Sequence, residues 1–138
     1  MANHSIKLDI LTPLGPKRRN LEVSGVEIPG LSGELGVLPD HVPFVTPIVP
    51  GVVRFREGDS SIRIAVGAGF LEIGADGRVA ILVERALDPD EIDVSMAREA
   101  LARVNAELSS QHDSIDAAEY RKLVTQQGWL EAQIRAVL

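Results

Sequence analysis

Apolar and polar residues alternate along short stretches of the chain up to residue 86. The apolar stretches lie at residues 6–10, 21–28, 52–55, 62–66, 70–73 and 79–83. A period of two places successive side chains on opposite faces of a β-strand. The Asp76-Gly77 turn between two apolar runs predicts a β-hairpin. The unbroken run at 79–83 predicts a strand that is covered on both faces.

The spacing of apolar residues changes to three and four after Pro89, the last proline of the chain. This spacing is that of one face of an α-helix. Asp88 and Pro89 predict the start of a first helix with Asp88 as its cap, and Asp113 or Ser114 can cap a second helix. The residues expected in the seam between the helices are Val94, Ala97, Leu101, Val104, Leu108, Tyr120, Leu123, Leu130, Ile134 and Val137.

The two patterns together predict an α+β fold. It consists of an N-terminal antiparallel β-sandwich over residues 1–86 and a C-terminal antiparallel two-helix hairpin over residues 87–138. Helices of this length are marginally stable alone, and a two-helix hairpin buries only one narrow seam. We therefore expect the hairpin to dock on another surface and to act as a movable, regulatory element.

The composition narrows the class of protein. The chain has 138 residues, of which 45% are hydrophobic, as expected for one globular domain with an appendage. Its net charge of −6 disfavours nucleic acid as a partner. The sequence contains no run of about 18 apolar residues, so we expect no membrane span. The absence of cysteine excludes disulfides and thiolate metal sites, and it fits a cytoplasmic location.

Catalytic chemistry is not indicated by the sequence. His4, His41 and His112 match no metal-binding spacing, so we expect neither a metal site nor an enzyme. The Gly67-Ala68-Gly69 stretch lacks a following helix, and it indicates a bend or a close backbone approach instead of a nucleotide loop. Trp129 has two interpretations: partial burial at the edge of the hairpin, or an anchor for a partner.

The most distinctive segment is residues 32–43, SGELGVLPDHVP. Its glycines and prolines exclude a helix and predict a rigid, turning loop between edge strands. Rigid loops on a β scaffold commonly make functional contacts, and here Glu34 and His41 would be the polar side chains that are presented. The alternative interpretation is a structural double turn in which Glu34 is only solvated.

This segment resembles the signature of the epsilon subunit of bacterial F-type ATP synthases. Residues 8–13, 50–54, 64–73 and 79–83 resemble other strands of that family in the same order. The resemblance implies a non-catalytic rotor subunit of the central stalk in a proton-translocating synthase. The sandwich would bind the gamma subunit and the c-ring, at the cytoplasmic face of the inner (plasma) membrane and peripheral to it. The catalytic alpha and beta subunits would handle ATP.

The resemblance also implies particular interface residues. Those expected to contact the c-ring and gamma are Gly33, Glu34, Leu35, Gly36, Leu38, Pro39, Asp40 and His41. Asp40 stands where glycine is common in the family, so we expect a positive φ there, which Asp tolerates better than most residues.

Some family members bind ATP through an I/L-D-x-x-R-A motif at the start of the first helix. The matching residues here are Ile92, Asp93, Met96 and Ala97, with Met96 in place of the arginine. Gln126 and Leu130 also stand where better binders have arginines. A phosphate without guanidinium partners loses charge-assisted hydrogen bonds, so we expect weak or absent ATP binding and no cofactor.

The hairpin of many bacterial members inhibits ATP hydrolysis. The residues that could make inhibitory contacts here are Arg98, Arg103, Arg121 and Lys122. Two other classes of protein stay open. The first is a free-standing sensor whose hairpin responds to a small metabolite, and the second is a jelly-roll-like enzyme, which the missing His/Glu metal set disfavours.

Overall fold

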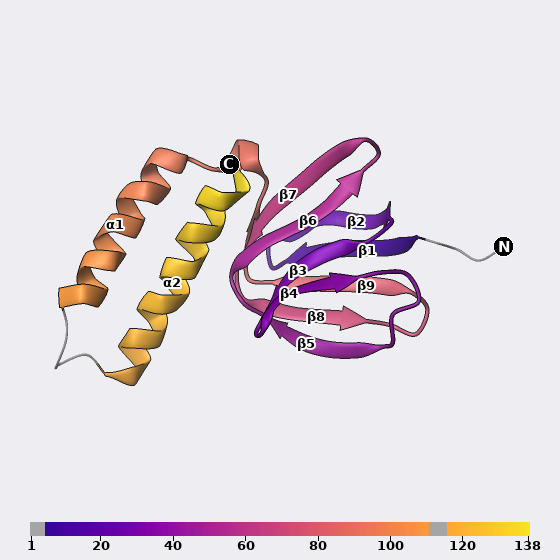
Figure 1. The fold of residues 1–138 in the computed structure, drawn as a ribbon, viewed down its shortest axis with the longest axis horizontal. Helices are drawn as coiled ribbons and strands as arrows, with labels where there is room; N and C mark the ends of the chain where they lie inside the picture. Colours follow the sequence, from indigo (N-terminus) through magenta and orange to yellow (C-terminus); the bar gives the residue numbers. More distant parts are fainter. Residues whose placement is uncertain (1–4, 111–115) are drawn as a thin grey trace.

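The computed structural model describes residues 5–110 and 116–138. The strands are β1 (Ile6–Thr12), β2 (Gly15–Val23), β3 (Val26–Gly30), β4 (Gly33–Val37), β5 (Phe44–Ile48), β6 (Gly51–Glu57), β7 (Ser60–Val66), β8 (Gly69–Ile73), β9 (Arg78–Val83) and β10 (Ala86–Leu87). The helices are the 3₁₀ turn η1 (Pro89–Glu91), α1 (Val94–Ser110) and α2 (Ala117–Ala136). The strands form a sandwich, and the two helices lie together at one end of it (Figure 1).

The strands are hydrogen-bonded in the order β10-β7-β6-β3-β5-β8-β9-β1-β2, and β4 pairs with β3. All neighbouring pairs are antiparallel except β1 with β9, which run parallel in the register Lys7↔Arg78. The predicted antiparallel sandwich is thus confirmed, with this one parallel pair as an exception. A parallel pair needs a long crossover, and here the intervening strands provide it.

The core of the sandwich consists of the inward-facing residues, which alternate with outward-facing ones along the strands. Leu8, Ile10, Ile64, Leu71 and Ile81 are each fully buried. The predicted period of two is present in β1, β8 and β9. The prediction that β9 is covered on both faces is wrong, because Leu82 is 41% exposed on the outer face while its neighbours are buried.

Gly69 marks a close approach of two backbones, which is one of the two alternatives predicted for this stretch. A Cβ atom at Gly69 would lie 2.7 Å from Cα of Val83 and 2.8 Å from the carbonyl carbon of Leu82. Gly69 pairs with Val83 on β9 and with Ile48 on β5. Only glycine fits where β8 is held this tightly between its two neighbours.

The helices form the predicted antiparallel hairpin, and α2 lies between α1 and the sandwich (Figure 1). Trp129, Ala132 and Ala136 of α2 pack on Val52 of β6 and Ala65 of β7. Contacts between α2 and these two strands are extensive, whereas α1 contacts mainly α2. The hairpin is thus attached to the sandwich by one helix.

Trp129 is 6% exposed and faces the sandwich. Both sequence-based interpretations of this residue are wrong in the described structure, because the ring is neither at the hairpin edge nor free for a partner. The Arg85 guanidinium lies 4.8 Å from the centre of the ring. The side chain therefore joins the two parts of the molecule by apolar packing and a cation–π contact.

The helix starts differ from the prediction. Asp88 and Glu91 belong to η1, where the Glu91 carboxylate accepts the Asp88 backbone N–H at 2.8 Å. Helix α1 begins only at Val94, with Asp93 accepting the Met96 N–H at 3.1 Å. Asp116 caps α2 through the Glu119 N–H at 2.8 Å.

Several predicted features fall in parts of the chain outside the described residues. These are the caps proposed at Asp113 and Ser114 and the expectations for His4 and His112. In the described part, Tyr120 is 53% exposed, so its assignment to the seam is wrong.

Candidate functional site

The segment around Glu34 is a strand and not the loop that the prolines and glycines predicted. Gly33, Glu34, Leu35 and Gly36 form β4, which pairs with β3 in the register Pro29↔Glu34. Glu34 is exposed and forms an ion pair with Arg54 of β6, at 2.8 Å between Oε1 and Nη1. Its carboxylate therefore lies on the outer face of the sheet and already has a partner in the isolated chain.

The turn after β4 holds the remaining predicted interface residues. Asp40 has φ +67°, which agrees with the expectation of a left-handed backbone at this position. The His41 ring lies 5.1 Å from the ring of Phe44, centre to centre. Leu38 and Val42 are each about two-thirds exposed, at 66% and 69%. The turn, which includes Pro39, presents apolar side chains beside an imidazole.

Glu34 and His41 do not lie together. They are at opposite ends of β4, so Glu34 is near the β3–β4 turn while His41 lies with Ile73 and Gly77 beside the β8–β9 turn. The short interval between Glu34 and His41 in the sequence suggested that a single loop presents both side chains. The structure gives two separate surfaces, one at each end of the strand.

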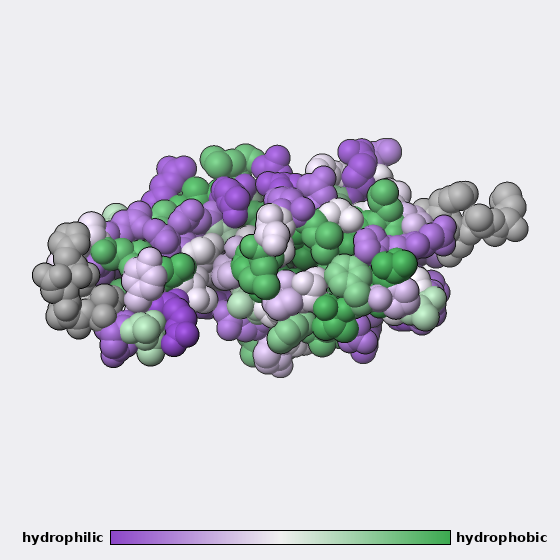
Figure 2. Space-filling view, turned by 60° about the horizontal axis from the view of Figure 1, so that its bottom comes forward, coloured by the Kyte–Doolittle hydropathy of each residue, from purple (hydrophilic) through white to green (hydrophobic). Residues whose placement is uncertain are grey.

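An apolar row, made of Pro47, Phe70, Leu82 and Leu11, crosses the outer face of four strands. The register places Pro47 opposite Phe70, Phe70 opposite Leu82, and Leu82 opposite Leu11. Phe70 is 54% exposed, and nearby Val45 on the same face is 64% exposed. Figure 2 shows one side of the molecule on which hydrophobic side chains gather over the sandwich.

Sequence reasoning missed this row. Each of its residues sits in a strand where an apolar side chain is unremarkable, and only the cross-strand register brings them into line. An exposed contiguous apolar surface on a globular protein commonly marks a site for a partner. The one sequence signal for this row was the unbroken apolar run at 79–83, since in a strand it places Leu82 on the face opposite the core.

Seven of the expected seam residues pack together between the two helices. Ala97, Val104, Leu123 and Leu130 form one buried cluster, and Leu101, Leu108 and Ile134 pack against it. Val94 is half-buried at the start of α1 and is not part of that cluster. Gln127 donates a hydrogen bond to Asn105 across the helices at 2.8 Å.

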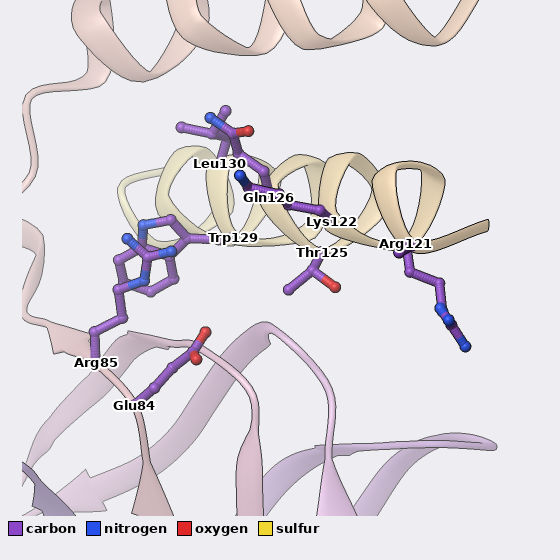
Figure 3. Close-up of a pocket in the computed structure, with 9 residues that line it drawn as sticks. Glu84, Arg85, Arg121, Lys122, Thr125, Gln126, Trp129 and Leu130 are labelled. Atoms are coloured by element: carbon purple, nitrogen blue, oxygen red, sulfur yellow. The ribbon is translucent and has the colours of Figure 1, made fainter. Parts of the chain in front are cut away.

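A groove of about 700 Å³ lies between the first half of α2 and the sandwich. It is lined by Glu84 and Arg85 on the sandwich side, and by Arg121, Lys122 and Gln126 on α2, among others. Arg85 lies beside Trp129 at one end, whereas Arg121 points away from that end (Figure 3). The cations of the groove are therefore spread along it and do not converge on one point.

The residues of the nucleotide-like motif are dispersed. Ile92 packs against the α2–sandwich contact, Asp93 caps α1, and Ala97 is buried in the helix seam. Met96 is 66% exposed and does not line the groove, and Leu130 is only 8% exposed. The four expected inhibitory cations are divided in the same way, because Arg98 and Arg103 are on α1 and only Arg121 and Lys122 reach the groove.

A charged cluster, made of Lys17, Arg18, Glu57, Asp88 and Glu91, joins β2 to β6 and η1. Arg18 pairs with Asp88 at 3.0 Å and with Glu57 at 3.5 Å. Lys17 pairs with Asp88 at 3.7 Å and with Glu91. Burial lowers the pKa of Arg18, but hydrogen bonds and the charges of Asp88 and Glu57 outweigh it and raise the pKa overall. Two hydrogen bonds to the Glu91 carboxylate, first that from Lys17 and then that from the Asp88 N–H, lower the pKa of Glu91.

Within residues 5–110 and 116–138, no group of three or more His, Cys, Asp or Glu side chains could hold a metal ion. None of the helices in that same part of the chain is long and apolar enough to cross a membrane. The fold and its exposed surfaces define a β-sandwich module that carries a docked helical hairpin.

Residues 5–89 match the family model of the ATP synthase delta/epsilon chain β-sandwich domain. The ATP synthase epsilon chain of Alkalihalophilus pseudofirmus is 40% identical over 113 residues, which are 81% of this chain and 84% of that one. The epsilon chain of Moorella thermoacetica is 42% identical over 117 residues, 83% and 84% of the two chains. This chain therefore belongs to the ATP synthase epsilon family and is a non-catalytic subunit of that enzyme.

The solved structures show the same fold. A chain in the Euglena gracilis mitochondrial ATP synthase, in a structure of OSCP, F1 and the c-ring, has a TM-score of 0.83 at 23% identity. The match covers all of this chain and 84% of that one. A chain in the central stalk/c-ring structure of the Tetrahymena thermophila mitochondrial ATP synthase has a TM-score of 0.67 at 14% identity, with both chains fully covered.

Proposed function

We propose that this chain is a rotor subunit of the central stalk that joins the gamma subunit to the c-ring, as a peripheral protein at the cytoplasmic face of the inner (plasma) membrane. Family membership supports the assignment to the synthase. The observation that carries the docking role is the apolar row of Pro47, Phe70, Leu82 and Leu11. In the isolated chain Pro47, Phe70 and Leu82 are exposed and Leu11 is half-buried.

The gamma subunit is the proposed occupant of the apolar row. Phe70 is 54% exposed, so covering the ring contributes about 1–2 kcal/mol from apolar area alone. A carboxylate at this position would in addition be buried without a partner. We expect Phe70→Asp to weaken binding to purified gamma by about tenfold or more.

Isothermal titration of the purified chain with gamma tests this assignment. Val124→Asp is the matched control, because Val124 is a 39% exposed apolar residue on α2, away from the row. Equal affinities of the Phe70→Asp and Val124→Asp proteins would refute the docking role of the row. Recovery of the chain without gamma and the catalytic subunits in a pull-down from native membranes would favour the free-standing sensor.

The two ends of β4 are the proposed contacts with the c-ring and gamma. Because Glu34 and His41 lie at opposite ends of the strand, they would meet different parts of the rotor. The chain has no cysteine, so single cysteines can be placed at Glu34 and at His41 and each cross-linked in the assembled synthase. Identical cross-linked partners from both positions would contradict two separate surfaces.

We further propose that the chain binds ATP weakly or not at all. The groove beside α2 offers Gln126 where the better-binding relatives have an arginine, and Leu130 is buried in the seam. Met96 lies outside the groove lining. Titration calorimetry with ATP checks this expectation, and micromolar affinity would overturn it.

Inhibition of ATP hydrolysis by the hairpin is a second proposed role. Arg98, Arg103, Arg121 and Lys122 form no ion pair within the described residues, so their charges are available to an acidic partner surface. The test is deletion of the hairpin in the assembled synthase. A faster hydrolysis rate supports inhibition, and an unchanged rate contradicts it.

A further inference from the structure

The outer face of β6 and β7 carries three arginines beyond the part that α2 covers. Val52 and Ala65 lie beneath α2, and the two strands extend away from that contact (Figure 1). The next outward-facing residues are Arg54 and Arg56 on β6 and Arg63 on β7. Arg54 and Arg63 are directly opposite each other in the register, where like charges destabilise a sheet. Because the chain has a net charge of −6, this gathering of cations on one face indicates an anionic partner.

The three arginines differ in how far their charges are balanced. Arg54 forms the ion pair with Glu34 at 2.8 Å. Arg63 donates a hydrogen bond to the backbone carbonyl of Leu138. Arg56 donates one to a backbone carbonyl at 2.8 Å, and it has no ion pair among the residues that the structure describes. A carbonyl oxygen has only a partial charge, so the Arg56 guanidinium keeps a full positive charge for a ligand.

A hollow of about 460 Å³ lies on the same face, and its lining includes Arg54 and Arg56. Gly25 and Gly36 also line it, and their lack of side chains leaves the backbone open there. A Cβ atom at Gly36 would meet nothing within 4 Å. Leu38, which is 66% exposed, lines the hollow as well. One ligand can therefore contact two guanidinium groups and an exposed apolar side chain.

The other polar groups of the lining restrict the charge of that ligand. The hydroxyl groups of Ser24 and Ser61 can donate hydrogen bonds to an oxyanion. Glu27 lies opposite Arg54 in the register and adds one carboxylate to the lining. This carboxylate repels a second negative charge on a ligand, so a monoanion fits better than a dianion. A phosphodiester is a monoanion, whereas a phosphate monoester has close to two negative charges at pH 7.

We propose that this hollow binds the phosphodiester headgroup of a phospholipid. Arg54 and Arg56 donate hydrogen bonds to the phosphate, which guanidinium groups bind well because of their planar, forked geometry. Leu38 packs against the first carbons of the lipid, a contact that free phosphate lacks. This inference rests on the proposed position of the chain at the membrane face. Leu38 belongs to the turn that is proposed to meet the c-ring, so lipid headgroups are within reach there.

NMR titration of the isotope-labelled full chain tests this site. The probe is dihexanoyl phosphatidylglycerol, kept below its micelle concentration. We expect shifts of the Gly25 and Gly36 amide signals and of the Arg54 and Arg56 side-chain signals. Two charge-assisted contacts and one small apolar contact correspond to a Kd of about 1 mM. Inorganic phosphate and hexyl maltoside, an uncharged amphiphile, are the comparison probes, and at equal concentration they should leave these signals unchanged.

Two variants separate this site from a general attraction between charges. Arg56→Gln should weaken binding of the lipid by about tenfold, because it removes one charge-assisted contact. Arg19→Gln is the matched control, since Arg19 is an exposed arginine of β2 outside the hollow and its loss changes the net charge equally. Gly36→Leu fills the hollow without any change of charge, and it should weaken binding by about tenfold as well. Unchanged amide signals away from the hollow establish that each variant is folded.

Equal lipid affinities of the Arg56→Gln and Arg19→Gln proteins would overturn the proposal, and so would full binding by the Gly36→Leu protein. Equal affinity for inorganic phosphate would overturn the assignment to a lipid, because the site would then bind any phosphate. Equal shifts with hexyl maltoside would show that the phosphate plays no part. The titration uses the isolated chain without gamma, so its failure is distinct from a failure of the proposed rotor role, which the Phe70→Asp titration tests.

Discussion

Substitution of Gly69 by alanine tests the close packing of β8 against β9. The added Cβ would lie 2.7 Å from Cα of Val83 and 2.8 Å from the carbonyl carbon of Leu82. Both are backbone atoms of a paired strand, so no side chain can turn aside to make room. Gly69 is also paired with Ile48 on the opposite side, which prevents β8 from moving away without loss of that pairing.

The expected loss in the free energy of unfolding is about 3 kcal/mol, the upper end of the range for overpacking, because strand separation is the only relief. Gly36→Ala is the control, since a Cβ there meets nothing within 4 Å. Alanine in a strand interior loses less backbone entropy than glycine, so Gly36→Ala should gain about 0.5–1 kcal/mol.

Urea unfolding followed by circular dichroism at the β-sheet wavelength measures both variants against the parent chain. A loss of about 3 kcal/mol is a large part of the 5–15 kcal/mol that is typical of folded domains. If the two alanine variants differed by less than about 0.5 kcal/mol, the reasoning from the Gly69 contact would be refuted.

Other predictions concern the turn after β4 and the charged cluster. Asp40 has φ +67°, a conformation that strains a β-branched residue, so Asp40→Val should lower the free energy of unfolding by about 1–2 kcal/mol while Asp40→Gly should not. Thermal melts measure both variants, and equal melting temperatures would contradict this backbone strain. The Lys17 hydrogen bond lowers the pKa of Glu91 below its ordinary value of 4.5. Its contribution to stability is therefore present above that value and is lost as the pH falls through the lowered pKa. The Glu91→Gln protein should show a smaller loss of stability in acid than the parent chain, by urea unfolding at pH 7 and pH 4, and an identical loss would contradict this contribution.

Local sequence signals determined much of the fold. The period of two and the Asp76-Gly77 turn predicted strands that exist, and the spacing of three and four predicted both helices. These signals succeed because the side chains of one element share a face with their near neighbours in sequence. The positive φ at Asp40 was foreseeable from the family resemblance, because glycine is common at this position in the family.

The features that sequence reasoning missed depend on neighbours far away in the chain. Trp129 has the spacing of a hairpin-edge residue, and only the docking of α2 on β6 and β7 buries it. Asp88 and Pro89 are typical of the start of an α-helix. In the structure they begin the short 3₁₀ turn η1, and Asp88 pairs with Lys17 and Arg18 of β2. β4 contains two glycines, and its pairing with β3 outweighs their low strand preference.

The parallel pairing of β1 with β9 has a consequence for how the chain folds as it is synthesised. β1 is synthesised before the other strands of the sandwich, but one of its two partners, β9, is the last long strand. Contacts between segments so distant in sequence form late, because loop closure precedes any gain from pairing. Nearly the whole sandwich must therefore be synthesised before the sheet can close. The helices are synthesised last, when the surface on which they dock has already formed. A synthesis pause placed before β9 should leave β1 open to proteolysis, whereas a pause after β9 should protect it.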